Sequence, residues 1–294
     1  MKYYFAILLL ISCTALQAAP MKLRYYADTT SKTTADTDTV IRKQSATIGV
    51  SYGSDVQFFG RTGPITYPFV STDAIYNFKN GVFLYGSGLK VLGYDPFFDE
   101  IDLGAGYLYN LSKNFTGSVS YTRFLFNKDA AQVIRSASSN DLDLNNSYNW
   151  GFAKSGIILD YLFGKANDGF VTVNTSKYFE SKFSIFDDKD YLTFTPAIAA
   201  IFGTQNFVQQ YSIDHQYRED YDNIFYSNPN VPRMAQSNSL FKLLDYNFKI
   251  PIAYNRPHYT LEFAYKYSIP LNVEGILLNH RESFYNLTFY YVFF

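Results

Sequence analysis

Long segments of this chain alternate apolar and polar residues with a period of two. The segment from Tyr259 to Ile269 sets Tyr259, Leu261, Phe263, Tyr265, Tyr267 and Ile269 on one face against Thr260, Glu262, Ala264, Lys266 and Ser268 on the other. This period predicts β-strands, because successive side chains of a strand point to opposite faces. The pattern recurs at 46–53, 70–78 and 101–109, and no window after residue 20 sustains a helical period. The chain is therefore expected to be all-β.

The lengths of the segments and of their connections select one class of all-β protein. The segments run to roughly 9–15 residues, whereas a tilted membrane-spanning strand needs about 9–11 and a globular strand averages nearer 5–6. Short turns are predicted at 79–81, 112–114, 165–169, 203–205 and 255–257, and longer polar connections at 60–68, 95–100, 127–146, 184–190, 218–238 and 272–282. Short and long connections alternate, as periplasmic turns and external loops do in transmembrane barrels. Residues 44–294 are thus predicted to form a closed antiparallel transmembrane β-barrel of about 12 strands.

The composition agrees with a wall that faces lipid. Aromatic residues make up 19% of the 294 residues, with 28 Tyr, 28 Phe and one Trp, while charged residues are only 17%. Tyrosine favours the two membrane–water interfaces, where barrels carry aromatic girdles. We expect Tyr109, Tyr161 and Tyr254 near short turns, and Tyr52, Tyr191 and Tyr267 near external ends. The near-zero net charge of −1 offers no basic surface for nucleic acid.

The N-terminus reads as an export signal followed by a polar leader. Residues 1–19 combine a lysine, a short apolar run and small residues, and are predicted to be a signal peptide. Cys13 lies inside this segment. The run Leu10-Ile11-Ser12-Cys13 also resembles a bacterial lipobox, in which the cysteine would be acylated; we favour the plain signal peptide, because an integral barrel needs no lipid anchor. Residues 20–43 are polar, lack an apolar period and are expected to form a flexible leader.

The last segment carries a resemblance to a known class of protein. Residues 283–294 alternate, and the chain ends on Phe294. This resembles the C-terminal targeting strand of Gram-negative outer-membrane β-barrel proteins, and the Tyr/Asn-rich texture is similar to the Bacteroidota variety. The resemblance implies the cell outer membrane, contact with its lipid, and recognition by the barrel-assembly machinery through the C-terminal strand. Both faces of this strand end in aromatic residues, so parity leaves open whether Phe293 or Phe294 faces lipid.

Two prolines and two of the histidines bear on strand regularity and on possible metal or catalytic sites. Pro196 and Pro251 each lack a ladder donor, so we expect a bulge or bend at each. His258 and His280 fall near opposite ends of one hairpin, which argues against a shared metal site. His280 and Ser283 fall on opposite faces of a strand, which argues against a lipid-facing catalytic pair. No catalytic residue, metal site or cofactor is predicted, and the chain is not expected to be an enzyme.

The inward faces carry charges of both signs, which are the candidate functional residues. They are Asp73, Lys90, Asp102, Lys154, Asp160, Asp245, Lys249, Glu262 and Lys266. They could line a pore and select solutes by a transverse field, or fill the lumen as charge pairs. A barrel of about 12 strands lies between side-chain-filled barrels and open porins, so its size decides neither.

The leading hypothesis for the function is a narrow passive channel for small hydrophilic solutes. The alternative is a closed structural or adhesion barrel that acts through its external loops. A lipid-modifying barrel enzyme ranks third.

Overall fold

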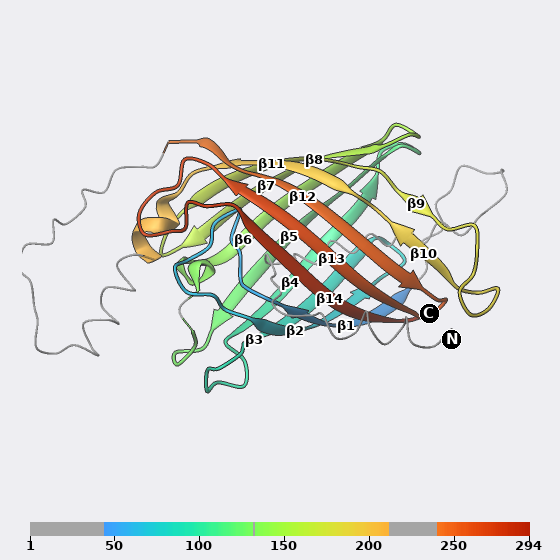
Figure 1. Ribbon diagram of the computed structural model, residues 1–294, viewed down its shortest axis with the longest axis horizontal. Coiled ribbons are helices and arrows are strands. Elements are labelled where there is room, and N and C mark those ends of the chain that lie inside the picture. Colours follow the sequence, from blue (N-terminus) through green and yellow to red (C-terminus); the bar gives the residue numbers. More distant parts are fainter. Residues whose placement is uncertain (1–43, 132, 212–239) are drawn as a thin grey trace, which may run out of the picture.

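The computed structural model describes residues 44–131, 133–211 and 240–294 and contains a wall of antiparallel strands (Figure 1). The predicted signal peptide and leader, Cys13 and the loop at 218–238 lie outside these residues. The strands are β1 (Ser45–Gly53), β2 (Phe69–Asn77), β3 (Val82–Val91), β4 (Glu100–Asn110), β5 (Phe115–Phe126), β6 (Ser138–Asn149), β7 (Lys154–Gly164), β8 (Asp168–Ser176), β9 (Phe179–Glu180), β10 (Tyr191–Phe194), β11 (Ala197–Gly203), β12 (Lys242–Asn255), β13 (Tyr259–Pro270) and β14 (Glu282–Phe293). A 3-10 helix, η1 (Ile134–Ala137), precedes β6.

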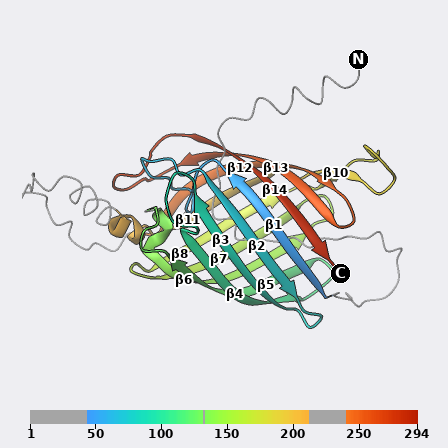
Figure 2. The same ribbon diagram turned by 90° about the horizontal axis from the view of Figure 1, so that it is seen from below.

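The wall closes on itself. Each strand pairs antiparallel with its neighbours, β1 lies between β2 and β14, and β11 joins β8 to β12 (Figure 2). The short β9 continues β8, and β10 continues β11, so the ring is an all-β closed antiparallel barrel of 12 strands. Closure pairs the backbone groups of every wall strand and leaves no sheet edge around the ring.

The break between β10 and β11 lies where two prolines meet. Phe194 pairs with Ile252 and Ala197 pairs with Lys249, which places Thr195 and Pro196 opposite Pro251 and its neighbour. Neither proline has an N–H to donate to the ladder. The sequence predicts a bulge or bend at each proline. At Pro196 the ladder is interrupted, but the register with β12 is the same on both sides, so there is no bulge. A bulge at Pro251 is also wrong, because the pairing of β12 with β13 runs through this residue without a shift.

The barrel has two unlike ends. We call the end where β1 begins and β14 ends the proximal end, and the other the distal end. The proximal connections include the short turns 78–81, 111–114, 150–153 and 256–258, whereas the distal ones include the long segments 54–68, 127–137, 204–241 and 271–281. Gly81, with φ of 94°, supplies the left-handed conformation that the tight β2–β3 turn requires.

The strict alternation of short and long connections holds only in part. Residues 138–146, the second half of the loop predicted at 127–146, belong to β6, while residues 206–211, left for a strand between the predicted turn at 203–205 and the loop at 218–238, are helical. The two errors cancel in the strand count. Between them, however, each connection lies at the opposite end of the barrel from the one predicted. As a result the short connection 165–167 is distal, and the connection that includes 181–190 is proximal.

The same reversal moves two of the predicted girdle tyrosines. Tyr161 lies near the distal end of β7 instead of near a proximal turn, and Tyr191 lies at the proximal start of β10. Tyr191 also pairs with Asn255 on the inward face of β12, so it does not face outward.

The two faces of the wall separate as the alternation predicts. On β13, Leu261 and Phe263 are exposed outward, while Ala264 and Ser268 on the other face are buried. On β14, Phe293 continues the exposed outward row of Leu287, Phe289 and Tyr291. The last strand therefore turns Phe293 outward, which answers the question that parity left open.

Candidate functional site

The candidate site is the interior of the barrel, and it holds the predicted charges with one exception. The inward faces carry Asp73, Asp102, Lys154, Asp160, Asp245, Lys249, Glu262 and Lys266. The prediction is wrong for Lys90. It pairs with Val70 on the outward face, and its ammonium donates to the carbonyl of Tyr94.

The misassignment of Lys90 has a physical cause. Gly86 and Gly88 lie on the same face of β3 as Lys90, and these small residues suggested that this face is polar and points inward. In the structure the other face of β3 is inward, and its rings of Phe83 and Tyr85 lie over Gly106 and Gly104 of β4. Aromatic rings on glycine gaps thus fill part of the lumen, and the outward glycines of β3 pack beside larger neighbours such as Leu103.

Loop residues pack against inward wall residues at the distal end of the lumen. The segment 54–68 folds back through a turn at Phe58–Arg61, where Phe59 and Gly60 have positive φ. Phe58 is buried against Phe170 and Phe207 in edge-to-face contacts, with ring centroids 6.0 and 4.9 Å apart. Inward wall residues join loop residues in this cluster, which we call the distal plug. Its buried members are Phe58, Phe124, Ile134, Ala137, Leu162, Phe170, Ile201, Phe207, Val208, Tyr211, Leu244 and Leu277.

One arginine ties the segments of the distal plug together. Arg61 is completely buried. Its Nε donates to Oε1 of Gln205 over 2.8 Å, and its guanidinium donates to the carbonyls of Leu244 at 2.7 Å and Leu271 at 2.5 Å. Burial lowers the pKa of Arg61 to about 10, partly offset by the charges of Asp245 and Glu274. The group therefore stays charged at neutral pH and joins three segments that are remote in sequence.

A second buried arginine fixes η1 to the wall. Arg135 pairs with Glu100 and, at 3.0 Å, with Asp102, and its guanidinium lies 5.0 Å from the ring centroid of Phe124. Breaking such a buried pair leaves an uncompensated charge, which costs about 3–5 kcal/mol. Asp102, predicted to line a pore, is therefore a partner of the loop that carries η1.

The lysines of β12 and β13 divide between the plug and the more open interior. Lys266 donates to Oε1 of Gln57, and its ammonium lies 5.5 Å from the ring centroid of Phe284. Lys249 is the direct cross-strand partner of Lys266; its side chain is 37% exposed and lies 3.9 Å from Glu262. Asp245, on the distal side, is buried and accepts from Ser268 at 2.6 Å. Asp245 is thus more buried than Lys249 and Glu262, which both lie nearer the proximal end.

The sequence missed the loop residues that organise the plug. Gln57, Arg61 and Arg135 lie in segments with no period, where a charged residue is normally solvated. Asp55 belongs with them, since it accepts backbone N–H groups from Val56 at 2.8 Å and Tyr67 at 2.7 Å. Burial raises the pKa of Asp55 to about 7 against these hydrogen bonds, with a further increase from the charge of Glu282.

The described residues contain no group of three or more metal-ligating side chains that could hold a metal ion. No helix among them is long and apolar enough to cross a membrane.

The chain was compared with known families, sequences and structures. No family model and no curated protein matches it. Among solved structures it is similar to one titled "KdgM porin", with 9% identity, a TM-score of 0.48 and coverage of 84% of this chain and 99% of that chain. A structure titled "KdgM porin in complex with disordered oligogalacturonate" gives 10% identity, a TM-score of 0.45 and coverage of 85% and 99%. The NanC porin gives 9% identity, a TM-score of 0.41 and the same coverage. At these identities the likeness concerns the fold alone.

Proposed function

We propose that the chain is an outer-membrane barrel that passes small hydrophilic solutes through its lumen once the distal plug is displaced. The observation that carries this proposal is that loop residues, and not the wall alone, build the distal plug. Eight strands already enclose an interior that side chains fill, whereas 16–18 leave an aqueous channel. A ring of 12 strands lies between these sizes. Displacing the loops would leave an interior lined by Asp160, Lys249 and Glu262.

The proposed placement follows from the outer surface and the turns. Exposed aliphatic and aromatic side chains cover the outward faces of the strands, as a lipid-facing wall requires. The proximal end, with most of the short turns and the end of β14, would face the periplasm. The aromatic β14 would be the strand that the barrel-assembly machinery recognises. We propose no enzymatic step.

Planar-bilayer conductance tests the channel. The wild type is expected to show rare openings, and Arg61→Ala frequent ones, because the substitution removes the donor that joins Gln205, Leu244 and Leu271. Arg256→Ala is the matched control, since this arginine pairs with Asp187 in the proximal turns. It should leave the openings unchanged. A folded Arg61→Ala barrel that never conducts would refute the channel.

The second candidate is a closed barrel that acts through its loops. The plug itself favours it, because Phe58, Phe207 and Tyr211 are almost completely buried. This function requires that neither the wild type nor Arg61→Ala conducts, while both fold and insert.

A further inference from the structure

The hairpin of β9 and β10 carries apolar side chains and extends the wall at its proximal end. In both views it projects beyond the other proximal turns (Figures 1 and 2). Among the described residues β9 pairs only with β10, because β7 begins at Lys154, opposite Ser176 of β8. The exposed aromatic residues of this region are Tyr178, Phe179, Phe183, Phe186, Tyr191 and Phe194.

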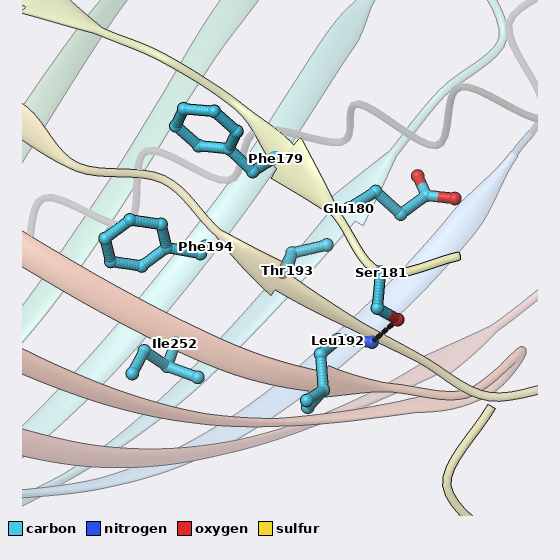
Figure 3. A pocket seen from close by; sticks show the side chains of 7 residues that line it. All are labelled: Phe179, Glu180, Ser181, Leu192, Thr193, Phe194 and Ile252. Atoms are coloured by element: carbon cyan, nitrogen blue, oxygen red, sulfur yellow. Dashed lines mark hydrogen bonds between the residues drawn. The ribbon is translucent and has the colours of Figure 1, made fainter. Parts of the chain in front are cut away.

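A groove of about 300 Å³ opens at the base of this hairpin. Its apolar lining comes from Phe179, Leu192, Phe194 and Ile252. Phe179, Phe194 and Ile252 lie side by side along it (Figure 3), and the two phenyl centroids are 5.9 Å apart.

The strand register places this apolar lining on the outward face. Phe179 pairs with Phe194, Phe194 pairs with Ile252, and Ile252 pairs with Phe263 of the outward row on β13. Side chains paired across antiparallel strands point to the same face. The groove is therefore continuous with the apolar wall that the proposed function places in lipid.

A cation lies beside the groove. Lys177 is exposed, and its ammonium lies 5.2 Å from the ring centroid of Phe179. An apolar groove with a lysine at its border suits a lipid that has a hydrocarbon chain and an anionic headgroup, since lysine keeps its charge in water while its stem covers apolar surface.

The hairpin tip is held in place before any ligand binds. Asp190 accepts backbone N–H groups from Ile185 at 2.6 Å and Phe186 at 2.9 Å, and the hydroxyl of Tyr254 at 3.0 Å. Arg256 of the β12–β13 turn pairs with Asp187. These contacts fix the loop 181–190 onto the wall, so binding would cost little ordering of the chain.

We propose that this groove binds one acyl chain of a glycerophospholipid from the leaflet at the proximal end, with the lipid phosphate at Lys177. The site rests on the proposed membrane-spanning barrel but not on solute conduction. A protein that inserts into vesicles without conducting would refute the channel and leave this site to be tested.

Native mass spectrometry of the full chain tests the site. The barrel is reconstituted in vesicles of phosphatidylethanolamine and phosphatidylglycerol and released in mild detergent. The wild type is expected to retain one phospholipid. The double variant Phe194→Ser with Ile252→Ser should lower the retained fraction at least five-fold, because it replaces two apolar side chains of the lining.

A matched pair on the wall serves as the control. Val50 and Phe289 are also cross-strand partners, and their exposures of 46% and 43% are similar to the 46% and 38% of Ile252 and Phe194. Val50→Ser with Phe289→Ser should retain lipid as the wild type does. Equal loss in both double variants would show general lipid contact and overturn the site. The site would also be overturned if the inserted wild type retained no lipid.

The lysine is tested separately. Lys177→Glu should reduce the retained phosphatidylglycerol relative to phosphatidylethanolamine at least three-fold, because it reverses the charge beside the groove. Lys189→Glu, in the hairpin tip, should leave this ratio unchanged. An unchanged ratio in Lys177→Glu would overturn the placement of the phosphate.

Discussion

At the scale of single residues, the interior depends on buried polar groups in loops. Arg61 joins three segments through charged hydrogen bonds, and each such bond contributes about 1.5–3 kcal/mol. Asp55 joins the two ends of its own loop, since it accepts from Val56 and from Tyr67. These side chains are buried, so their charge states affect the stability of the distal plug.

The raised pKa of Asp55 predicts that the plug loosens as pH rises. The pKa is about 7 in the folded protein against an ordinary value of 3.8, so the folded state binds the proton more tightly. The stabilisation is complete below pH 3.8 and is lost as pH rises through 7. Hydrogen exchange of the amides at 54–68, corrected for intrinsic rates, should show weaker protection at pH 8 than at pH 5.

Asp55→Asn supplies the control for this prediction. It removes the titrating group, so the protection should no longer change between pH 5 and pH 8. A pH dependence that persists in Asp55→Asn would assign the effect to another group.

At the scale of elements, strand identity follows from the apolar side chains that each strand turns outward. β6 carries Leu142, Leu144 and Tyr148 outward, which is enough for a wall strand, while Asp141 and Asp143 point inward. These acidic residues made the segment read as a loop. The β9–β10 hairpin depends instead on a polar side chain, because the carboxylate of Asp190 accepts hydrogen bonds from its loop and from the wall. Hydrogen bonds from the backbone and from Tyr254 lower the pKa of Asp190, although burial opposes them.

Asp190→Asn should release the loop 181–190. The carboxylate accepts from Ile185 at one oxygen and from Phe186 and Asp187 at the other. An amide has a single oxygen, and its NH2 group cannot accept. Trypsin cleavage after Lys182 and Lys189 should become at least five-fold faster, as measured on the folded barrel. Asp188→Asn, a neighbouring exposed carboxylate, should leave the rate unchanged. Equal rates in both variants would mean that Asp190 does not hold the loop.

At the scale of the whole molecule, a closed wall surrounds an interior that the distal plug fills at one end. Two charged side chains nearer the proximal end are partly exposed. The buried plug explains how a ring of 12 strands avoids an empty lumen. Lys249 and Glu262 lie nearer the proximal end and are partly exposed, so a solute that passes the barrel would meet them.

Lys249→Glu should shift ion selectivity toward cations in the Arg61→Ala background. The substitution removes the lysine that lies 3.9 Å from Glu262 and adds a second carboxylate. Reversal potentials in a KCl gradient measure the shift. Lys242→Glu is the control of matched exposure, 35% against 37%, and it lies at the distal rim beside Glu274. An equal shift in the two variants would remove Lys249 from the solute path.

The wall faces could be predicted because alternation is local, whereas the strand count agreed because two errors cancelled. Tyr259 to Ile269 shows its two faces without any knowledge of its neighbours, and the exposed apolar outer face leaves this pattern uninterrupted. Lys90 was misplaced because glycines beside it suggested an inward face, whereas Phe83 and Tyr85 occupy the lumen over glycines of the next strand. That choice depends on the partner strand and could not be read from β3 alone.

The sequence by itself determined an all-β closed barrel with apolar side chains outward, since period-two patterning sets which side of each strand avoids water. Only the tertiary structure decided what fills the interior. The partners of Arg61 are the side chain of Gln205 and the backbone carbonyls of Leu244 and Leu271, more than 140 residues away in sequence. A backbone carbonyl carries no sequence signature, so the plug became visible only when the ring had brought these segments together.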